Sequence, residues 1–194
     1  MTDEKPKLYH ERQRLQLCAL HSLNSLFQQP LFTKKSLDDI VAELDKSWCW
    51  NEYSTLITGN YDLKIIIEAL KRQGYTLRAI DNTQPFDAFS FEDYFGLLLN
   101  IPLKMSYFDR LPVVRSFTKP GRHWLSIKSV DGQMFHNFDS KNTKAELIGN
   151  RTALIDFLKQ YSREHTYIYI VLREDEVDQF EQKYGLKPTT QEIP

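Results

Sequence analysis

The sequence predicts a single α+β domain in which a helical N-terminal part packs on a C-terminal antiparallel sheet. Segments with apolar residues at helical spacing fill the first half of the chain, and β-rich runs dominate the second half. Helices that precede strands are the order expected of an α+β domain. The chain has 194 residues, 41% of them hydrophobic, which is enough to bury one substantial core.

Three helices are expected in the first half of the chain. Cys18 lies in the first turn of the first helix, Ser36 and Asp39 resemble a capping box at the start of the second, and Asp62 can cap the third. Gly74 is placed to end the third helix in a left-handed conformation. The apolar faces consist of Leu20, Leu23 and Phe27; of Leu37, Ile40, Val41 and Leu44; and of Ile66, Ile67, Ala69 and Leu70.

Strands are expected mainly in the second half, at residues 75–80, 123–129, 133–139 and 166–172. The middle two flank the turn signal Asp131-Gly132, and two turn lengths are open. A three-residue loop would place His123 opposite Asp139. A two-residue turn would instead place Trp124 there and direct the Asp139 carboxylate to the other face of the sheet.

Three further helices are expected. Residues 91–99 read as a short apolar helix, and Asn150 or Thr152 can start another, whose apolar face consists of Leu154, Phe157, Leu158 and Tyr161. The acidic stretch 174–178 can begin a last helix, which Gly185 and Pro188 would end. Residues 189–194 are expected to be disordered.

Composition excludes several classes of function. A net charge of −1 supplies no field that would attract nucleic acid. The N-terminus lacks the apolar core of a signal peptide, and no run approaches the roughly 18 apolar residues of a membrane span. Two cysteines and five histidines without close spacing do not suit a zinc site. We expect a monomer of the cytoplasm or nucleus without metal or cofactor.

Cys18 is the candidate nucleophile. The reactive form of a cysteine is the thiolate, which a helix N-terminus and a neighbouring imidazole favour by lowering the pKa of a thiol. Cys18 has the first of these features. The alternative is a small buried residue on an apolar helix. Cys49 has no motif around it and should be dispensable.

Two histidines are candidate bases. His21 lies three residues after Cys18 on the same helix, has little freedom to reach past the sulfur, and fits a packing or solvated role better. His123 opens a strand after a loop and is the stronger candidate. If Asp139 accepts a hydrogen bond from one imidazole nitrogen, the other nitrogen can face the thiol. Asn137 is the rival orienting group.

An oxyanion needs hydrogen-bond donors. The backbone N–H of Cys18 can supply one, and the side-chain amide of Gln13, five residues earlier, can supply another. Alone, Gln13 reads as a solvated surface residue.

Residues 9–24, YHERQRLQLCALHSLN, resemble the opening of the Josephin domain. Further matches are Gly59-Asn60-Tyr61-Asp62, His123-Trp124 and Asn137-Phe138-Asp139-Ser140-Lys141, in the order and approximate spacing that the family uses. The resemblance covers residues 9–173, which we take as the catalytic domain, with residues 174–194 as an acidic helix and tail. The chain looks most like the short, stand-alone members of the family.

The resemblance implies a papain-like fold and a thiol-dependent deubiquitinase, with Cys18, His123 and Asp139 at the triad positions and Gln13 at the oxyanion position. Ubiquitin, its chains and its conjugates are the implied partners. The alternative is a ubiquitin-binding module with weak or regulated catalytic activity.

Ubiquitin-binding residues are implied less specifically. The family binds ubiquitin near the segment that corresponds to residues 63–73, which points to Leu63, Lys64 and Gln73, although Gln73 replaces an expected aromatic residue. Trp124 could wall a narrow groove for the ubiquitin tail, or could be a core tryptophan.

Overall fold

The computed structural model describes residues 7–14, 16–44, 61–80, 86–103, 121–162 and 166–186. The helices are α1 (Cys18–Phe27), α2 (Lys34–Leu44), α3 (Leu63–Lys71), α5 (Arg151–Ser162) and α6 (Val177–Tyr184), with short 3-10 helices η1 (Phe86–Ala88) and η3 (Glu174–Glu176). The strands are β1 (Tyr75–Ile80), β2 (Gly96–Pro102), β3 (Arg122–Ser129), β4 (Phe135–Phe138), β5 (Glu146–Gly149) and β6 (Tyr167–Arg173).

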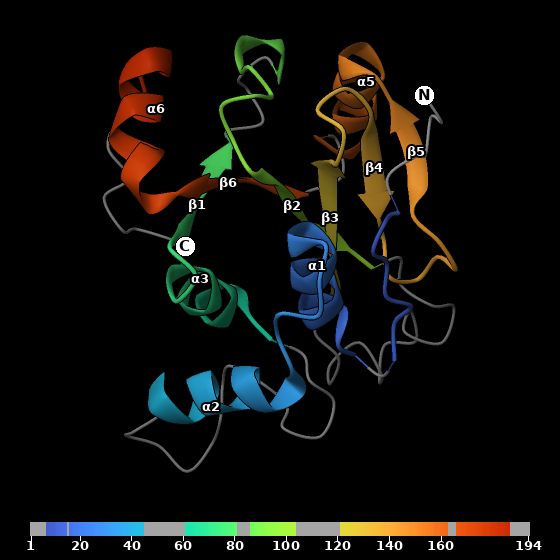
Figure 1. Ribbon diagram of the computed structural model, residues 1–194, viewed down its shortest axis with the longest axis vertical. Helices are drawn as coiled ribbons and strands as arrows, with labels where there is room; N and C mark the ends of the chain where they lie inside the picture. Colours follow the sequence, from blue (N-terminus) through green and yellow to red (C-terminus); the bar gives the residue numbers. More distant parts are fainter. Residues whose placement is uncertain are drawn as a thin grey trace, which may run out of the picture.

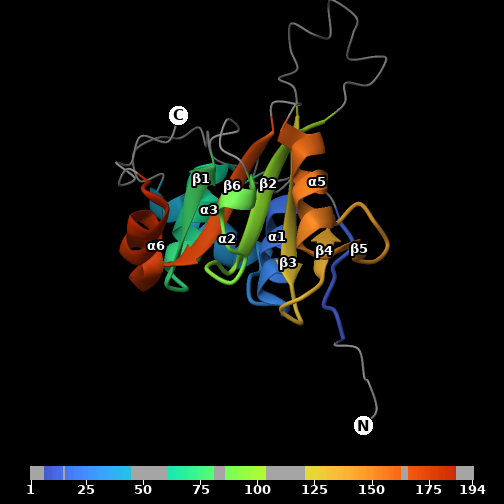
Figure 2. The same ribbon diagram turned by 90° about the horizontal axis from the view of Figure 1, so that it is seen from above.

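The strands form one antiparallel sheet of six strands in the order β1-β6-β2-β3-β4-β5. Helices α1, α2 and α3 lie on one side of the sheet, and α5 and α6 lie on the other (Figures 1 and 2). The predicted α+β class and the packing of the N-terminal helices on the sheet are confirmed. The second helical layer was not anticipated.

Alternation along the central strands explains why both faces are covered. In β6, Tyr169 and Val171 pack toward α1 to α3, whereas Ile168, Ile170 and Leu172 pack toward α5 and α6. Successive side chains of a strand point to opposite faces, so an apolar run of this kind can be buried only between two layers.

The helix expected at residues 91–99 was wrong, because residues 96–102 form strand β2. This strand pairs with β6 on one side and β3 on the other, and Leu97, Leu98 and Leu99 are all buried. Leu98 faces the layer of α1 to α3, and its two neighbours face the opposite layer. A strand that is apolar on both faces has no alternation, so its pattern cannot be distinguished from that of a buried helix.

Capping residues define the helix ends. The Asp62 side chain accepts hydrogen bonds from the N–H groups of Lys64 at 2.9 Å and Ile65 at 3.2 Å, as predicted. Gly74 has the predicted positive φ of 76°. The capping box expected at the start of α2 was placed wrongly.

The capping box of α2 lies one turn earlier than expected, at Thr33 and Ser36. The Thr33 hydroxyl accepts from the N–H of Ser36 at 3.1 Å, and the Ser36 hydroxyl accepts from the N–H of Thr33 at 2.9 Å. Thr33 therefore caps α2, and Asp39 instead pairs with Lys35 on the exposed face. Leu44, expected on the apolar face of this helix, is 46% exposed.

The C-terminal helices pack closely on the sheet. Asn150 caps α5 by accepting from the N–H of Ala153 at 3.1 Å. In α6 the buried Phe180 ring stacks on Phe89 with ring centroids 5.9 Å apart, and Glu181 pairs with Arg78 of β1 at 2.9 Å. The segment that follows β6 is thus part of the same packed structure.

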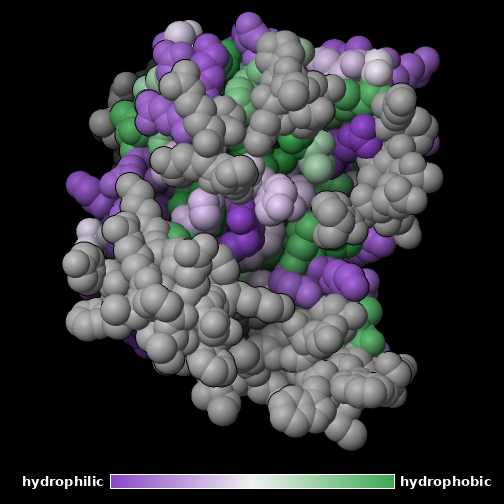
Figure 3. Space-filling model, turned by 180° about the vertical axis from the view of Figure 1, so that it is seen from behind, coloured by the Kyte–Doolittle hydropathy of each residue, from purple (hydrophilic) through white to green (hydrophobic). Residues whose placement is uncertain are grey.

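In the described part of the chain, the large apolar side chains that remain exposed are Leu31, Leu44, Leu103, Leu147 and Tyr167. From behind, hydrophobic side chains of the described residues show in small patches between hydrophilic ones (Figure 3). None of the helices within the described ranges is long and apolar enough to cross a membrane. Cys49 and residues 189–194 lie outside those ranges.

A half-buried lysine joins α1 to the sheet. Lys128 of β3 donates to the backbone carbonyl of Leu26 at 2.9 Å, and its Nζ lies 3.3 Å from the centroid of the Phe95 ring. Burial lowers the pKa of Lys128 from 10.5 to about 8. The folded state therefore binds this proton less tightly than the unfolded chain does.

We expect stability to depend on pH through Lys128. Between pH 8 and 10.5 the unfolded chain binds more protons than the folded chain at this site, so the free energy of unfolding should rise with pH in that window. Relative to Lys128→Met, the wild type should gain about 2 kcal/mol between pH 7 and pH 10. Urea unfolding of both proteins at the two pH values measures this difference, and a constant difference would contradict the assignment.

Candidate active site

The candidate nucleophile lies at the start of a helix. Cys18 is the first residue of α1 and is 4% exposed. The first turn, residues 18–21, holds no acidic residue, so the positive end of the helix dipole is not neutralised from within the helix. Helix α1 packs on β3, which carries the candidate base.

His123 is the second residue of β3, lies opposite Ile101 of β2 and is 1% exposed. Its Nε2 lies 2.6 Å from Oδ1 of Asp139, just beyond the end of β4. The same carboxylate oxygen accepts the N–H of Lys141 at 2.9 Å. Because Nε2 is engaged by Asp139, Nδ1 is the ring nitrogen left to interact with Cys18.

The electrostatics of the three groups are coupled. Burial by itself lowers the pKa of His123, but hydrogen bonds with Asp139 and Cys18 and the attraction of both groups outweigh it and raise that pKa. Burial raises the pKa of Asp139, but the hydrogen bonds from His123 and from the Lys141 N–H outweigh it and lower that pKa. Asp139 is therefore a carboxylate at neutral pH.

The contact between His123 and Asp139 arises from a hairpin that differs from the expected one. Ser129 pairs with Phe135, so residues 130–134 form the loop and the three-residue turn was wrong. Asp131 stabilises the longer loop by accepting from the N–H groups of Gln133 at 2.9 Å and Met134 at 2.7 Å. The partner of Ser129 is residue 135 instead of residue 133, a register shift of two residues. An even shift leaves each side chain of β4 on the same face of the sheet, which is why Asp139 still lies on the side of His123.

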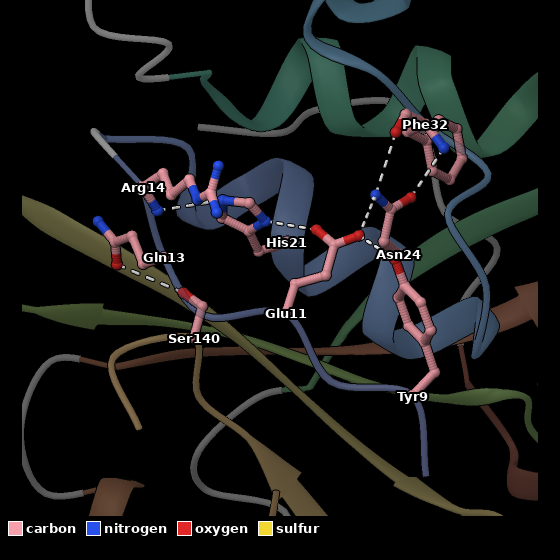
Figure 4. Close-up of polar contacts among 8 residues, drawn as sticks. All are labelled: Tyr9, Glu11, Gln13, Arg14, His21, Asn24, Phe32 and Ser140. Carbon is pink, nitrogen blue, oxygen red and sulfur yellow. Dashed lines mark hydrogen bonds and ion pairs between the residues drawn. The ribbon is translucent and has the colours of Figure 1, made fainter. Parts of the chain in front are cut away.

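Gln13 lies beside the loop that follows Asp139. Its backbone N–H donates to the carbonyl of Ser140 at 2.6 Å, and the Ser140 hydroxyl donates to its side-chain Oε1 at 3.3 Å (Figure 4). The oxygen of the Gln13 side-chain amide thus faces Ser140, and the amide nitrogen points away from Ser140 (Figure 4). Gln13 is half-buried and not a solvated surface residue.

Asn137, the rival orienting group, makes a different contact. Its Nδ2 donates to Oε2 of Glu146 at 3.4 Å, whereas Asp139 contacts the imidazole.

The residues suggested for ubiquitin binding do not gather at this site. Trp124 is 4% exposed, and its ring centroid lies 5.9 Å from that of Tyr169 inside the core, as the alternative interpretation has it. Leu63 packs partly against the core, while Lys64 and Gln73 are exposed on and just beyond α3.

The sequence did not reveal the role of Glu11, whereas His21 is buried in the packing of α1, one of the two roles expected of it. His21 is 8% exposed, and its Nδ1 lies 2.5 Å from Oε2 of Glu11. The sequence did not identify this carboxylate as the partner of His21. His21 and Asn24 lie one turn apart on α1, which indicates a shared polar contact on one face of the helix but does not identify Glu11 as the partner.

Among the residues that the structure describes, no three His, Cys, Asp or Glu side chains gather in a way that could hold a metal ion.

Helix α1 begins at Cys18 and packs on an antiparallel sheet in which β3 carries His123 and β4 leads to Asp139. This arrangement places the domain in the papain-like α+β class. A model of the Josephin family matches residues 13–172, and the chain belongs to this family.

Relatives extend this match over most of the chain. Josephin-2 of Homo sapiens is 38% identical over 157 residues, which cover 79% of each protein. A Josephin-like protein of Drosophila melanogaster is 33% identical over 172 residues, 87% of this chain and 75% of the relative. Ataxin-3 of Homo sapiens is 27% identical over 186 residues, 84% of this chain and 45% of that protein.

Proposed function

We propose that this protein is a deubiquitinating cysteine protease that hydrolyses peptide or isopeptide bonds at the C-terminus of ubiquitin. The observation that carries the proposal is the contact between His123 and Asp139 in a domain of the Josephin family, with Cys18 among the groups that raise the pKa of His123. The fold supplies a nucleophile on a helix and a base on the adjacent sheet, two parts that thiol-dependent acyl transfer needs.

Acylation begins when the Cys18 sulfur attacks the C-terminal carbonyl carbon of ubiquitin and His123 takes the thiol proton at Nδ1. The carbonyl oxygen becomes an oxyanion, which the backbone N–H of Cys18 and the side-chain amide of Gln13 stabilise. His123 then gives its proton to the departing lysine amine, the carbon–nitrogen bond breaks, and a thioester forms between ubiquitin and Cys18.

Deacylation reverses these roles. His123 removes a proton from a water molecule that attacks the thioester, and returns a proton to the Cys18 sulfur as the ubiquitin carboxylate leaves. Asp139 stays ionised throughout and holds the Nε2–H of the ring, which keeps Nδ1 directed at the reacting atoms.

The substrates of this reaction are ubiquitin chains and conjugates. The small residues at the end of the ubiquitin tail suit a narrow approach to the buried Cys18. Lys64 on α3 and Gln73 just beyond it offer an exposed second contact. We place the enzyme in the cytoplasm or nucleus as a monomer, where its substrates occur.

Release of a fluorescent amine from the C-terminus of ubiquitin tests this function. The wild type and Glu174→Gln, a change at an exposed residue of η3, should both release the amine with saturation kinetics. Ubiquitin binding without any release, by a protein that is folded by circular dichroism, would contradict the proposal and favour a ubiquitin-binding module.

A further inference from the structure

A second imidazole–carboxylate pair lies next to the candidate active site. Oε2 of Glu11 lies 2.5 Å from Nδ1 of His21, and its other oxygen accepts from the Tyr9 hydroxyl and from Nδ2 of Asn24, the latter at 3.1 Å (Figure 4). His21 and Asn24 both belong to α1, so Glu11 fastens the preceding segment to the helix that carries Cys18.

The hydrogen bonds define the tautomer of the His21 ring. The backbone N–H of Arg14 donates to Nε2 of His21 at 3.3 Å, so Nε2 must offer its lone pair (Figure 4). The proton of the neutral ring is then on Nδ1, where it faces Glu11. Burial raises the pKa of Glu11, but hydrogen bonds from His21, Tyr9 and Asn24 outweigh it and lower that pKa, so the carboxylate is ionised and can only accept.

The same segment is held on its other side by the loop after Asp139. His10 Nε2 contacts the carbonyl of Asn142 at 3.0 Å, and the Gln13 backbone N–H donates to the carbonyl of Ser140 at 2.6 Å. Residues 9–14 therefore bridge α1, which carries Cys18, and the loop that begins at Asp139. Gln13 makes one of the contacts with the loop and lies in the chain between Glu11 and Arg14, which both contact His21 of α1.

We infer that His21, held by Glu11 as the Nδ1–H tautomer, is a positioning residue that fixes the Gln13–Arg14 segment by accepting the Arg14 N–H. The inference rests on the proposed function, because its consequence for activity acts through the Gln13 amide at the oxyanion. Neither Glu11 nor His21 touches the reacting atoms in this scheme. A carboxylate that selects a histidine tautomer is the relationship proposed for Asp139 and His123, used here for placement.

Glu11→Gln is a nearly isosteric test. If the new amide nitrogen faces His21, it donates to Nδ1 and forces the Nε2–H tautomer, which sets a ring N–H against the Arg14 N–H. If the amide oxygen faces His21, the nitrogen is set against Nδ2 of Asn24. We expect the Nδ1–H tautomer to lose population in this variant, and hydrogen exchange of the Arg14 amide to accelerate.

Activity should fall in a way that general destabilisation does not explain. A donor displaced by a fraction of an ångström lowers transition-state stabilisation, so kcat should drop roughly 10- to 100-fold with KM changed by less than about 3-fold. Glu174→Gln, the same chemical change at an exposed residue, should leave kcat, the tautomer and the Arg14 exchange rate as they are in the wild type.

The experiment combines nitrogen-15 NMR of the histidine rings, exchange at Arg14 and steady-state kinetics on the fluorescent ubiquitin amide. An Nε2–H tautomer of His21 in the wild type would overturn the inference before any variant is made. So would a Glu11→Gln protein with an altered tautomer and an unchanged kcat. If the wild type itself cleaves nothing, the proposed function fails. The inference about His21 is then still refuted by an Nε2–H tautomer of His21 in the wild type, or by unaltered exchange of the Arg14 amide in Glu11→Gln.

Discussion

Replacing Cys18 with alanine is expected to abolish turnover while ubiquitin binding persists. The sulfur forms the covalent bond to the ubiquitin carbonyl, and no other group in the scheme can replace it, so kcat should fall by at least roughly 10⁴-fold. Alanine is small and favours helix, so α1 should remain intact at this buried position. Release of the fluorescent amine measures kcat, and calorimetric titration with ubiquitin measures binding.

Cys49→Ser is the matched control for that substitution. It changes the other cysteine of the chain and should keep full activity. A Cys18→Ala protein that turns over normally would refute the mechanism. A Cys49→Ser protein that is inactive at normal stability would mean that the nucleophile was assigned to the wrong cysteine.

His123→Ala should lower kcat more than Asp139→Ala does. Loss of the imidazole removes both the base for acylation and the acid that protonates the leaving amine, which should cost roughly 10³- to 10⁴-fold. Loss of Asp139 leaves the imidazole present but unoriented, and we expect a cost of roughly 10²-fold.

The pH behaviour of His123 provides an independent check of the Asp139 variant. The interaction with Asp139 is one of the causes that raise the pKa of His123 above its usual value. In Asp139→Ala the ring should therefore lose its proton at a lower pH than in the wild type. Titration of the His123 ring resonances by NMR measures the shift. A midpoint that does not move, or a lower kcat for Asp139→Ala than for His123→Ala, would argue against an orienting carboxylate.

Local signals in the sequence were sufficient for most of the fold. Asp62 caps the start of α3 and Gly74 has a left-handed conformation after its end, as expected. Such residues act through their immediate neighbours in the chain, so the sequence alone reveals them. The fold class followed from the order of helices and strands. Strand β2 was misread as a helix because both of its faces are buried, which only the position between β6 and β3 explains.

The contact between His123 and Asp139 was predictable from the sequence, but the hairpin that produces it was not. The pairing of His123 with Asp139 depends on an even shift of the hairpin register, and the loop length that produces it depends on how Asp131 bonds its own loop. The role of Glu11 could not be read from spacing, since residues 9–14 have no regular structure and are placed by contacts with α1 and with the loop after β4.

The most direct test of the central claim is reaction with ubiquitin that carries a thiol-reactive group at its C-terminus, followed by intact mass and peptide mapping. A single adduct on Cys18, lost in Cys18→Ala and weakened in His123→Ala, is the result that the proposed mechanism predicts. A folded protein that forms no adduct, or that forms it on Cys49, would contradict the proposal that Cys18 is the nucleophile of a deubiquitinase.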